Sequence, residues 1–182
     1  GEGPAGALAF SADGTKLAVG FDDGRLLVIP MTDGGVLALP QHRSPPTVME
    51  FSPSGEALVV GHFDGFVKVV GLPSLDDGAE IEPSRGPVTD VAFSPDGRSL
   101  AIADNERVRW FDVATWEPVA IAGREQGVVS MAFSPDGETL ATASSDATAM
   151  LHTRTGAPRT LRGHANGLVD VVFSTDGARL VT

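Results

Sequence analysis

The side chains in this sequence best suited to chemistry are a few serines, aspartates and histidines. Ser144, Ser145, Asp146 and His152 are the residue types of a hydrolytic triad, in which histidine activates the serine and aspartate orients the histidine. No nucleophile-elbow pattern surrounds either serine. Whether these residues act together therefore depends on the elements that carry them.

Metal and nucleotide chemistry find even less support. The four histidines are His42, His62, His152 and His164, which are far apart and lack the spacing of metal ligands. Asp22 and Asp23 do not belong to a twelve-residue calcium loop. The sequence has no glycine-rich phosphate loop ending in Lys-Ser or Lys-Thr. We expect no catalytic residue, no metal and no cofactor.

All these residues lie within an internal repeat. Its signature occurs five times, at Phe10-Ser11-Ala12-Asp13-Gly14, Phe51-Ser52-Pro53-Ser54-Gly55, Phe93-Ser94-Pro95-Asp96-Gly97, Phe133-Ser134-Pro135-Asp136-Gly137 and Phe173-Ser174-Thr175-Asp176-Gly177. The phenylalanines are separated by 41, 42, 40 and 40 residues, which is the period of a four-stranded propeller blade. Proline, aspartate and glycine favour a turn, and apolar residues flank it on both sides.

The repeat predicts an all-β fold, a β-propeller of four-stranded antiparallel blades with four complete blades and half of a fifth. We expect the chain, 1–182, to be one propeller segment. The predicted blades are residues 6–40, 47–82, 88–122 and 128–161, and the partial blade is 168–182. No stretch shows a helical period over ten or more residues.

Composition limits the classes of partner. The net charge of −11 disfavours nucleic acid and anionic membranes as partners, and no run of about 18 apolar residues could span a bilayer. The absence of cysteine excludes disulfides and fits a reducing cytoplasm, where we expect the protein to be located.

The repeat resembles the WD-repeat family, especially its bacterial members with Phe-Ser-Pro-Asp-Gly turns. Leu161-Arg162-Gly163-His164 is similar to the family's Gly-His element, and Phe111-Asp112 stands where the family has Trp-Asp. The resemblance implies a structural hydrogen-bond network in each blade. Its candidate members here are Asp64, Asp104, Trp110, Phe111, Asp112, Ser144 and Asp146. This interpretation of Ser144 and Asp146 is preferred to a catalytic one.

The family resemblance also implies that the loops entering the innermost strands share a face with the acidic turns. The candidate partner-binding residues on this face are Phe21, His42, Arg43, Phe63, Arg85, Arg124 and His164. One interpretation pairs the arginines with turn aspartates, as Arg43 with Asp64, Arg85 with Asp104 and Arg124 with Asp146. The other is a basic rim for an acidic or phosphorylated peptide. Phe21 and Phe63 either contact a partner or pack on the next blade.

We expect a non-catalytic scaffold or sensor module that binds a protein or peptide. One alternative is a propeller enzyme or a small-ligand site in the central channel, for which Thr47, Thr89, Asp90, Ser130 and Asp170 are available. Another is a self-assembling half-propeller. The chain stops within an apolar segment, so we expect further blades of the same protein, or another copy, to complete the ring.

Overall fold

The computed structural model describes residues 4–32, 34–74, 77–81, 86–124 and 127–182, without the side chains of residues 77 and 120–124. Within these residues the chain forms strands and turns and no helix, so none of them belongs to a helix that could cross a membrane. The all-β class that the repeat predicts is confirmed. The chain divides into two compact units, Gly1–Val88 and Thr89–Thr182.

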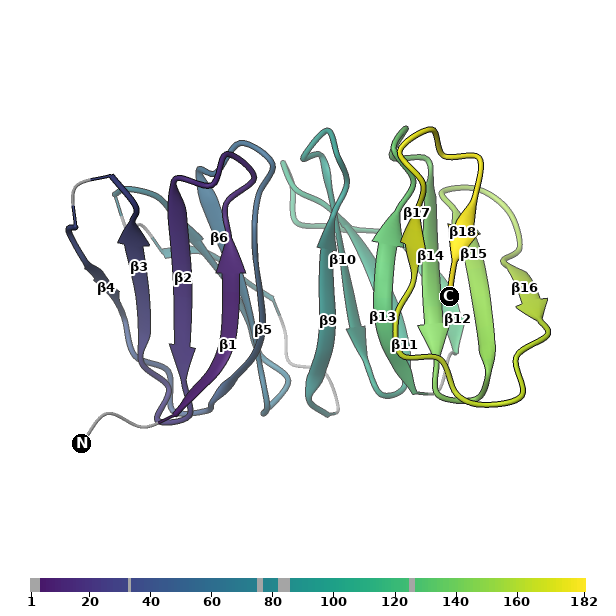
Figure 1. Ribbon diagram of the computed structural model, residues 1–182, viewed down its shortest axis with the longest axis horizontal. Helices are drawn as coiled ribbons and strands as arrows, with labels where there is room; N and C mark the ends of the chain where they lie inside the picture. The colour runs from purple at the N-terminus through teal and green to yellow at the C-terminus, as the bar shows by residue number, and fades with distance from the viewer. Residues whose placement is uncertain (1–3, 33, 75–76, 82–85, 125–126) are drawn as a thin grey trace. The chain divides into compact units, whose positions relative to one another are not determined.

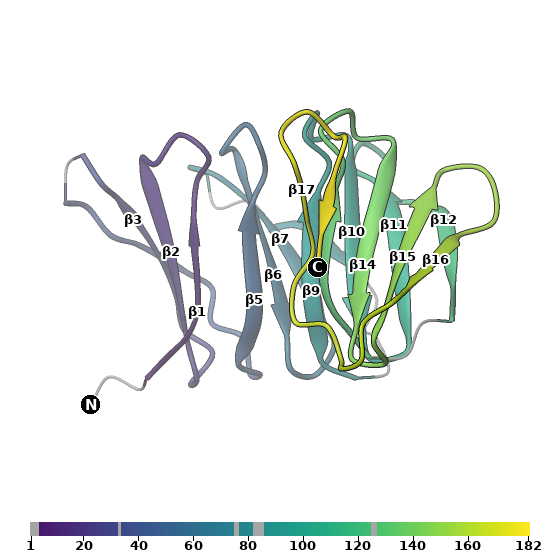
Figure 2. The same ribbon diagram turned by 45° about the vertical axis from the view of Figure 1, so that its right-hand side comes forward.

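The first unit contains two four-stranded antiparallel sheets (Figure 2). One sheet consists of β1 (Ala5–Phe10), β2 (Lys16–Phe21), β3 (Leu26–Pro30) and β4 (Leu37–Leu39), paired in chain order. The other consists of β5 (Pro46–Phe51), β6 (Ala57–His62), β7 (Val67–Gly71) and β8 (Asp77–Ile81). Each chain segment thus completes one sheet before the next begins.

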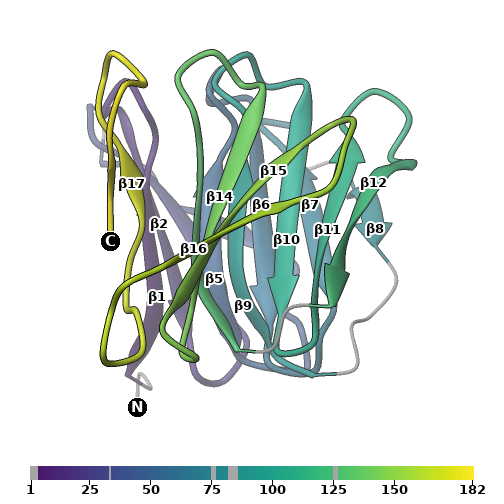
Figure 3. The ribbon, with the colours of Figure 1, turned by 90° about the vertical axis from the view of Figure 1, so that its right-hand side faces the viewer.

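The second unit repeats this arrangement. Its first sheet consists of β9 (Val88–Phe93), β10 (Ser99–Asp104), β11 (Arg107–Asp112) and β12 (Pro118–Arg124). The next consists of β13 (Val128–Phe133), β14 (Thr139–Ser144), β15 (Thr148–Thr153) and β16 (Arg159–Arg162), the last three labelled in Figure 3. A two-stranded sheet follows, made of β17 (Val172–Phe173) and β18 (Leu180–Val181), with β17 alongside β13 (Figure 1).

Neighbouring sheets pack a face rich in small residues against a face of larger ones. In the first unit, Ala7 and Ala18 of the first sheet share a buried cluster with Phe51 and Leu58 of the second. In the second unit, Ala141, Ala143 and Ala149 pack with Leu168 and Val171. A Cβ atom at Gly20 would lie 2.5 Å from Pro46 Cγ, so this strand also depends on the smallest residue. Small residues allow the sheets to approach closely enough to bury the larger side chains.

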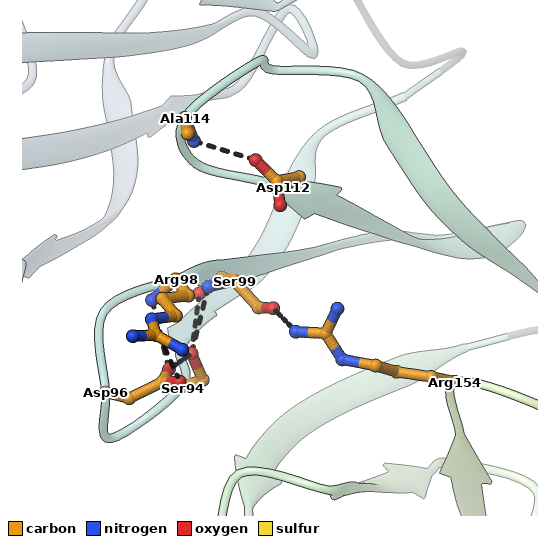
Figure 4. A network of polar contacts seen from close by, with 7 residues as sticks. All are labelled: Ser94, Asp96, Arg98, Ser99, Asp112, Ala114 and Arg154. Atoms are coloured by element: carbon orange, nitrogen blue, oxygen red, sulfur yellow. Dashed lines mark hydrogen bonds and ion pairs between the residues drawn. The ribbon is translucent and has the colours of Figure 1, made fainter.

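The recurrent Phe-Ser-Pro-Asp-Gly signature forms the turn between the first two strands of each sheet. In the third sheet, the Ser94 hydroxyl donates to Asp96 Oδ1 (2.6 Å) and accepts from the Ser99 N–H (2.9 Å) (Figure 4). Asp96 Oδ1 also accepts from the Arg98 N–H (3.0 Å). The same set of bonds surrounds Ser11, Ser134 and Ser174. The signature therefore recurs because its serine and aspartate satisfy the turn backbone.

These bonds also fix the charge state of the turn carboxylates. The hydroxyl of Ser11, and then the N–H of Thr15, lower the pKa of Asp13 from 3.8 to about 2. The serine hydroxyl is likewise the main cause of the lowered pKa of Asp96, Asp136 and Asp176. Hydrogen bonds to a carboxylate favour its ionised form. These turns are therefore anionic throughout the physiological pH range.

A polar contact also joins consecutive sheets of the second unit. The Asp90 carboxylate of β9 accepts the Met131 N–H of β13 (2.6 Å) and the Val91 N–H of its own strand (2.9 Å). One period later, the Ser130 hydroxyl donates to Asp170 Oδ1 (2.7 Å). Burial, together with the charge of Asp170, raises the pKa of Asp90 to about 7, although the two N–H bonds oppose this shift. These side chains are thus engaged in bonds between sheets.

The second sheet allows a direct test of the turn chemistry, because Ser54 occupies the aspartate position. Ser52 Oγ and Ser54 Oγ are 3.2 Å apart, and the Glu56 N–H donates to Ser54 Oγ over 3.3 Å. We expect Ser54→Asp to strengthen both bonds, contributing about 1 kcal/mol and raising the midpoint of thermal unfolding by about 2–4 °C. Differential scanning calorimetry measures this shift. Ser54→Ala is the control, and a midpoint for the aspartate variant at or below that of the alanine variant would contradict the prediction.

The raised pKa of Asp90 predicts a pH-dependent contribution to stability. Its carboxyl binds a proton more tightly in the folded chain than in the unfolded one, where the pKa is about 3.9. The unfolding free energy of the wild type minus that of Asp90→Ser should therefore fall as the pH rises from about 4 to 7, and then level off. Serine is the matched replacement, because Ser130 occupies the same position in β13. Urea titrations at several pH values measure the difference, and a constant difference would contradict this assignment.

Candidate functional site

An exposed aromatic ring and an exposed guanidinium lie together in the first unit. Phe63 and Asp64 begin the turn between β6 and β7, and Phe63 is 61% exposed. Arg43 belongs to the loop between β4 and β5, and its Nε lies 3.7 Å from Asp64 Oδ2. The Arg43 side chain is 79% exposed. We call the surface formed by Arg43, Phe63, Asp64 and Phe66 the β6–β7 surface.

Ser44 attaches the loop of residues 41–45 to this turn. Its carbonyl oxygen lies 3.0 Å from His62 Nδ1, and its hydroxyl accepts the Asp64 N–H over 3.0 Å. The neighbouring Pro45 carbonyl accepts the Phe63 N–H over 3.0 Å. Three bonds from two consecutive loop residues thus hold the backbone that presents the Phe63 ring.

The same loop is attached to the β2–β3 turn. The His42 N–H donates to the Gly24 carbonyl (3.1 Å), and Gln41 Nε2 donates to the Asp23 carbonyl (2.8 Å). Gly24 has a φ of +84°, and a Cβ atom there would collide with the His42 carbonyl oxygen. The loop therefore connects the acidic turns of both sheets in this unit.

A group of rings lies beneath the β6–β7 surface. The rings of His42 and His62 are in contact, with centroids 4.0 Å apart and planes tilted by 34°. His42 also approaches Phe66 (5.8 Å), and the Arg43 guanidinium carbon lies 5.8 Å from the centre of the Phe66 ring. His62 is fully buried, and burial lowers its pKa despite the opposing effects of the Ser44 carbonyl and Asp64.

Phe21 has a different environment from Phe63. Gly20 pairs with Leu26 in the first sheet as Gly61 pairs with Val67 in the second, so Phe21 has the position of His62. The half-buried Phe21 ring lies under the Arg25 guanidinium (4.7 Å), and Arg25 Nε is 2.7 Å from Asp23 Oδ2. Phe63 corresponds to Asp22 at the turn tip, which explains its greater exposure.

The remaining predicted face residues belong to the second unit or cannot be placed. Arg85 lies outside the described residues, and Arg124 ends β12 with a side chain that the structure does not describe. Their predicted pairs with Asp104 and Asp146 stay predictions. His164 Nε2 lies 2.7 Å from Thr182 Oγ1.

Asp104 and Asp146 each cap their own turn. Asp104 Oδ1 accepts the N–H groups of Glu106 (2.8 Å) and Arg107 (3.0 Å), and the Arg107 Nε lies 3.6 Å from Oδ2. Asp146 Oδ1 accepts from the Thr148 N–H (2.9 Å) and hydroxyl (2.6 Å). These contacts suit a structural role for both carboxylates.

The other predicted network residues lie in the third and fourth sheets. Trp110 is buried, edge-on to Phe133 with ring centroids 5.0 Å apart, and Phe111 is buried beside it in β11. The Asp112 carboxylate accepts the Ala114 N–H at the end of β11 (Figure 4). It also accepts the Thr115 N–H.

An arginine joins these two sheets. Arg154, which follows β15, donates to Ser99 Oγ (2.6 Å) in the third sheet, as Figure 4 shows. Its guanidinium carbon lies 5.5 Å from the Trp110 ring centre. This contact strengthens the packing of one sheet on the next.

The serines and histidine that could form a triad make local contacts. Ser144 Oγ accepts the Asp146 N–H (3.2 Å), and His152 Nε2 lies 3.4 Å from Thr142 Oγ1. Among the described residues, no three histidine, aspartate or glutamate side chains are grouped as metal ligands. These contacts are those of turn and strand structure.

Sequence reasoning missed the role of Ser44, and it predicted His42 as a face residue without recognising it as the histidine of its repeat. The Ser44 carbonyl that contacts His62 has no sequence signal, because every residue has one, and the Ser44 hydroxyl that accepts the Asp64 N–H belongs to no repeated motif. His42, however, follows Leu39 by three residues, as His164 follows Leu161 in the Gly-His element. That spacing could have identified His42 as the histidine of its repeat.

Comparison with known proteins agrees with the repeat and its sheets. The family model "WD domain, G-beta repeat" matches residues 35–70, 79–112 and 116–153, more than half of the chain. WD repeat-containing protein 1 of Mus musculus is 40% identical over 65 residues, and that of Bos taurus is 42% identical over 66. The 66 kDa stress protein of Physarum polycephalum is 27% identical over 89 residues.

These matches cover only part of each protein. They span 35% of this chain and 11% of the mouse and bovine proteins, and 48% of this chain and 15% of the Physarum protein. The relatives named here are eukaryotic, and the bacterial origin suggested by the turn sequence stays a prediction. With three family matches on a succession of four-stranded antiparallel sheets, this chain belongs to the WD-repeat family and forms part of a β-propeller.

Proposed function

We propose that this chain is a non-catalytic scaffold module that binds a protein or peptide segment on its β6–β7 surface. WD-repeat proteins are in general protein-interaction scaffolds, which sets the class of function. The observation that carries the proposal is the 61% exposed Phe63 ring on a turn that the loop of residues 41–45 holds in place. An aromatic ring on a fixed backbone loses little freedom on binding and is typical of interface hot spots.

Arg43 supplies the polar part of this surface. Its ion pair with Asp64 is long, at 3.7 Å, and largely exposed, so the pair contributes about 0–1 kcal/mol to stability. The guanidinium is therefore available to a carboxylate or phosphate of a bound peptide, with bidentate geometry. This supports the binding interpretation of Arg43 alongside its structural pairing. We further propose that the protein works in the cytoplasm, which suits a chain without cysteine.

Phe63 provides the first test of this function. We expect peptides selected from a displayed random library against the chain to lose at least about tenfold in affinity for Phe63→Ser, because the variant removes the aromatic anchor. Fluorescence polarisation with a labelled selected peptide measures the change. Val36→Ser is the matched control, since Val36 is also exposed (57%) and lies in the same unit. Equal affinity for the wild type and Phe63→Ser would reject the β6–β7 surface.

Arg43→Ala separates the two interpretations of the arginine. If Arg43 binds the peptide, its removal should weaken affinity about three- to thirtyfold while the unfolding midpoint changes by no more than about 2–4 °C. Calorimetry on the same samples measures the midpoint. A lower midpoint with unchanged affinity would show that Arg43 acts only as the partner of Asp64.

A second surface supports the proposal that another blade completes the fold. Leu8 and Phe10 on β1 are 63% and 64% exposed, whereas Phe51, at the same point of the next repeat, is 5% exposed under the first sheet. The exposed pair therefore matches the larger face of a sheet-to-sheet contact. We propose that a further WD-type blade of the same protein covers Leu8 and Phe10 with small residues, as Ala7 and Ala18 cover Phe51.

The double variant Leu8→Ser/Phe10→Ser tests this surface. Exposed apolar patches bind hydrophobic dyes and promote association, so dye fluorescence should fall by roughly half in the variant. Met31→Ser is the control, because Met31 is 55% exposed outside β1. Light scattering on the wild type completes the test: a stable dimer that the double variant abolishes would assign the face to a second copy and overturn this proposal.

A further inference from the structure

Hydrogen bonds fix the positions of the ring protons on the two neighbouring histidines beneath the β6–β7 surface. His62 Nδ1 faces the Ser44 carbonyl oxygen, an acceptor, at 3.0 Å, so Nδ1 carries the proton. His62 Nε2 is buried and has no hydrogen-bond partner among the residues that the structure describes. His42 Nδ1 accepts the Ser44 N–H over 3.2 Å and therefore carries no proton. Each ring thus has one nitrogen whose protonation would break a hydrogen bond or leave a buried N–H without an acceptor.

Protonation would disturb this arrangement in two ways. A proton on His62 Nε2 would be a donor without an acceptor in a site shielded from water, which carries a desolvation cost. A proton on His42 Nδ1 would oppose the Ser44 N–H and remove the acceptor that holds it. Two protonated rings with centroids 4.0 Å apart would also repel one another.

The charged groups around His62 do not reverse this balance. Asp64, from the same turn, favours the protonated ring, but its carboxylate is shared with Arg43 at 3.7 Å. Lys68 of β7 and His42 of the loop disfavour protonation. Asp23 of the β2–β3 turn is paired with Arg25 at 2.7 Å. Burial is the largest effect and keeps the pKa of His62 below its ordinary value.

The histidines and the Phe63 backbone depend on the same loop. Ser44 contacts both imidazoles and also accepts the Asp64 N–H, while Pro45 accepts the Phe63 N–H. We propose that His62, packed against His42, forms a pH-dependent latch, in which protonation of His62 releases the loop of residues 41–45 and frees the turn that presents Phe63. The effect on partner binding rests on the function proposed above, whereas the latch itself does not.

The direction of the effect follows from the buried neutral ring. The unfolded or opened chain takes up a proton on His62 at a pKa of about 6.5, and the closed chain does so only at lower pH. The closed loop is therefore fully stable above about pH 6.5 and loses stability as the pH falls below this value. The latch is closed at neutral pH and opens on acidification.

Amide hydrogen exchange reports on the latch without any ligand. After correction for intrinsic rates, we expect the protection of the Phe63 and Asp64 amides to fall at least about tenfold between pH 7.5 and pH 5, because both donate to the loop. The Val19 amide in β2, which lies in the same unit, should keep its protection. NMR detection resolves the individual amides.

His62→Phe is the matched variant, since Phe21 occupies the equivalent position in the first sheet. It removes the titrating group and keeps a buried ring, so its Phe63 and Asp64 amides should show protection that is independent of pH. His164→Phe, in the other unit, should behave as the wild type. Equal protection in the wild type at both pH values, or an undiminished pH dependence in His62→Phe, would overturn the latch.

If His62→Phe fails to fold, as judged by circular dichroism, the wild type still decides the question. The NMR titration of the His62 Cε1–H resonance should then coincide with the loss of Phe63 and Asp64 protection, and separate midpoints would reject the latch. A failure of peptide binding to depend on Phe63 would reject the proposed function and leave these exchange results unchanged.

Discussion

A four-stranded sheet with about twenty residues in its strands cannot bury an apolar face by itself. The packing of the sheets in this chain and the variation in its turns follow from that constraint. Within each unit one sheet lies against the next, and the alternation of small and large faces makes this possible. Phe51 is covered because Ala7 and Ala18 leave room for it, and Gly20 leaves room for Pro46. Packing between sheets therefore restricts the residue types in the strands, whereas the turns tolerate more variation.

One position shows how far that variation extends. One residue beyond the pairing of the second strand with the third, the side chain is Phe21, His62, Asp104 or Ser144 in the four complete sheets. Phe21 lies under Arg25, whereas His62 contacts the Ser44 carbonyl. Asp104 and Ser144 accept N–H groups of their own turns. This position at the start of the turn is therefore compatible with an aromatic ring, a carboxylate or a hydroxyl, each of which makes a different contact.

The sequence predicted the fold well because its signal is physical and repeated. The serine and aspartate of Ser94 and Asp96 recur two residues apart in four of the five turns because together they satisfy the turn backbone. The five turns, 40 to 42 residues apart, indicate one sheet each. The candidate site was harder to predict from the sequence than the fold. Arg43 and Asp64 could be paired from the family resemblance, but Ser44 acts through a carbonyl group that any residue possesses and a hydroxyl that lies outside the repeated motif.

Register explains the distinction between the two phenylalanines that sequence alone treated as equivalent. Both precede an aspartate, but a glycine precedes Phe21, while His62 stands between Gly61 and Phe63. Because of this one additional residue, Phe63 lies at the turn tip and not at the end of the strand. At the turn tip the strand pleat no longer directs a side chain toward a neighbouring sheet. Because His62 then takes the buried position, the exposed ring and the buried imidazole are consequences of one register. The proposed binding residue and its proposed control element therefore belong to the same local feature of the second sheet.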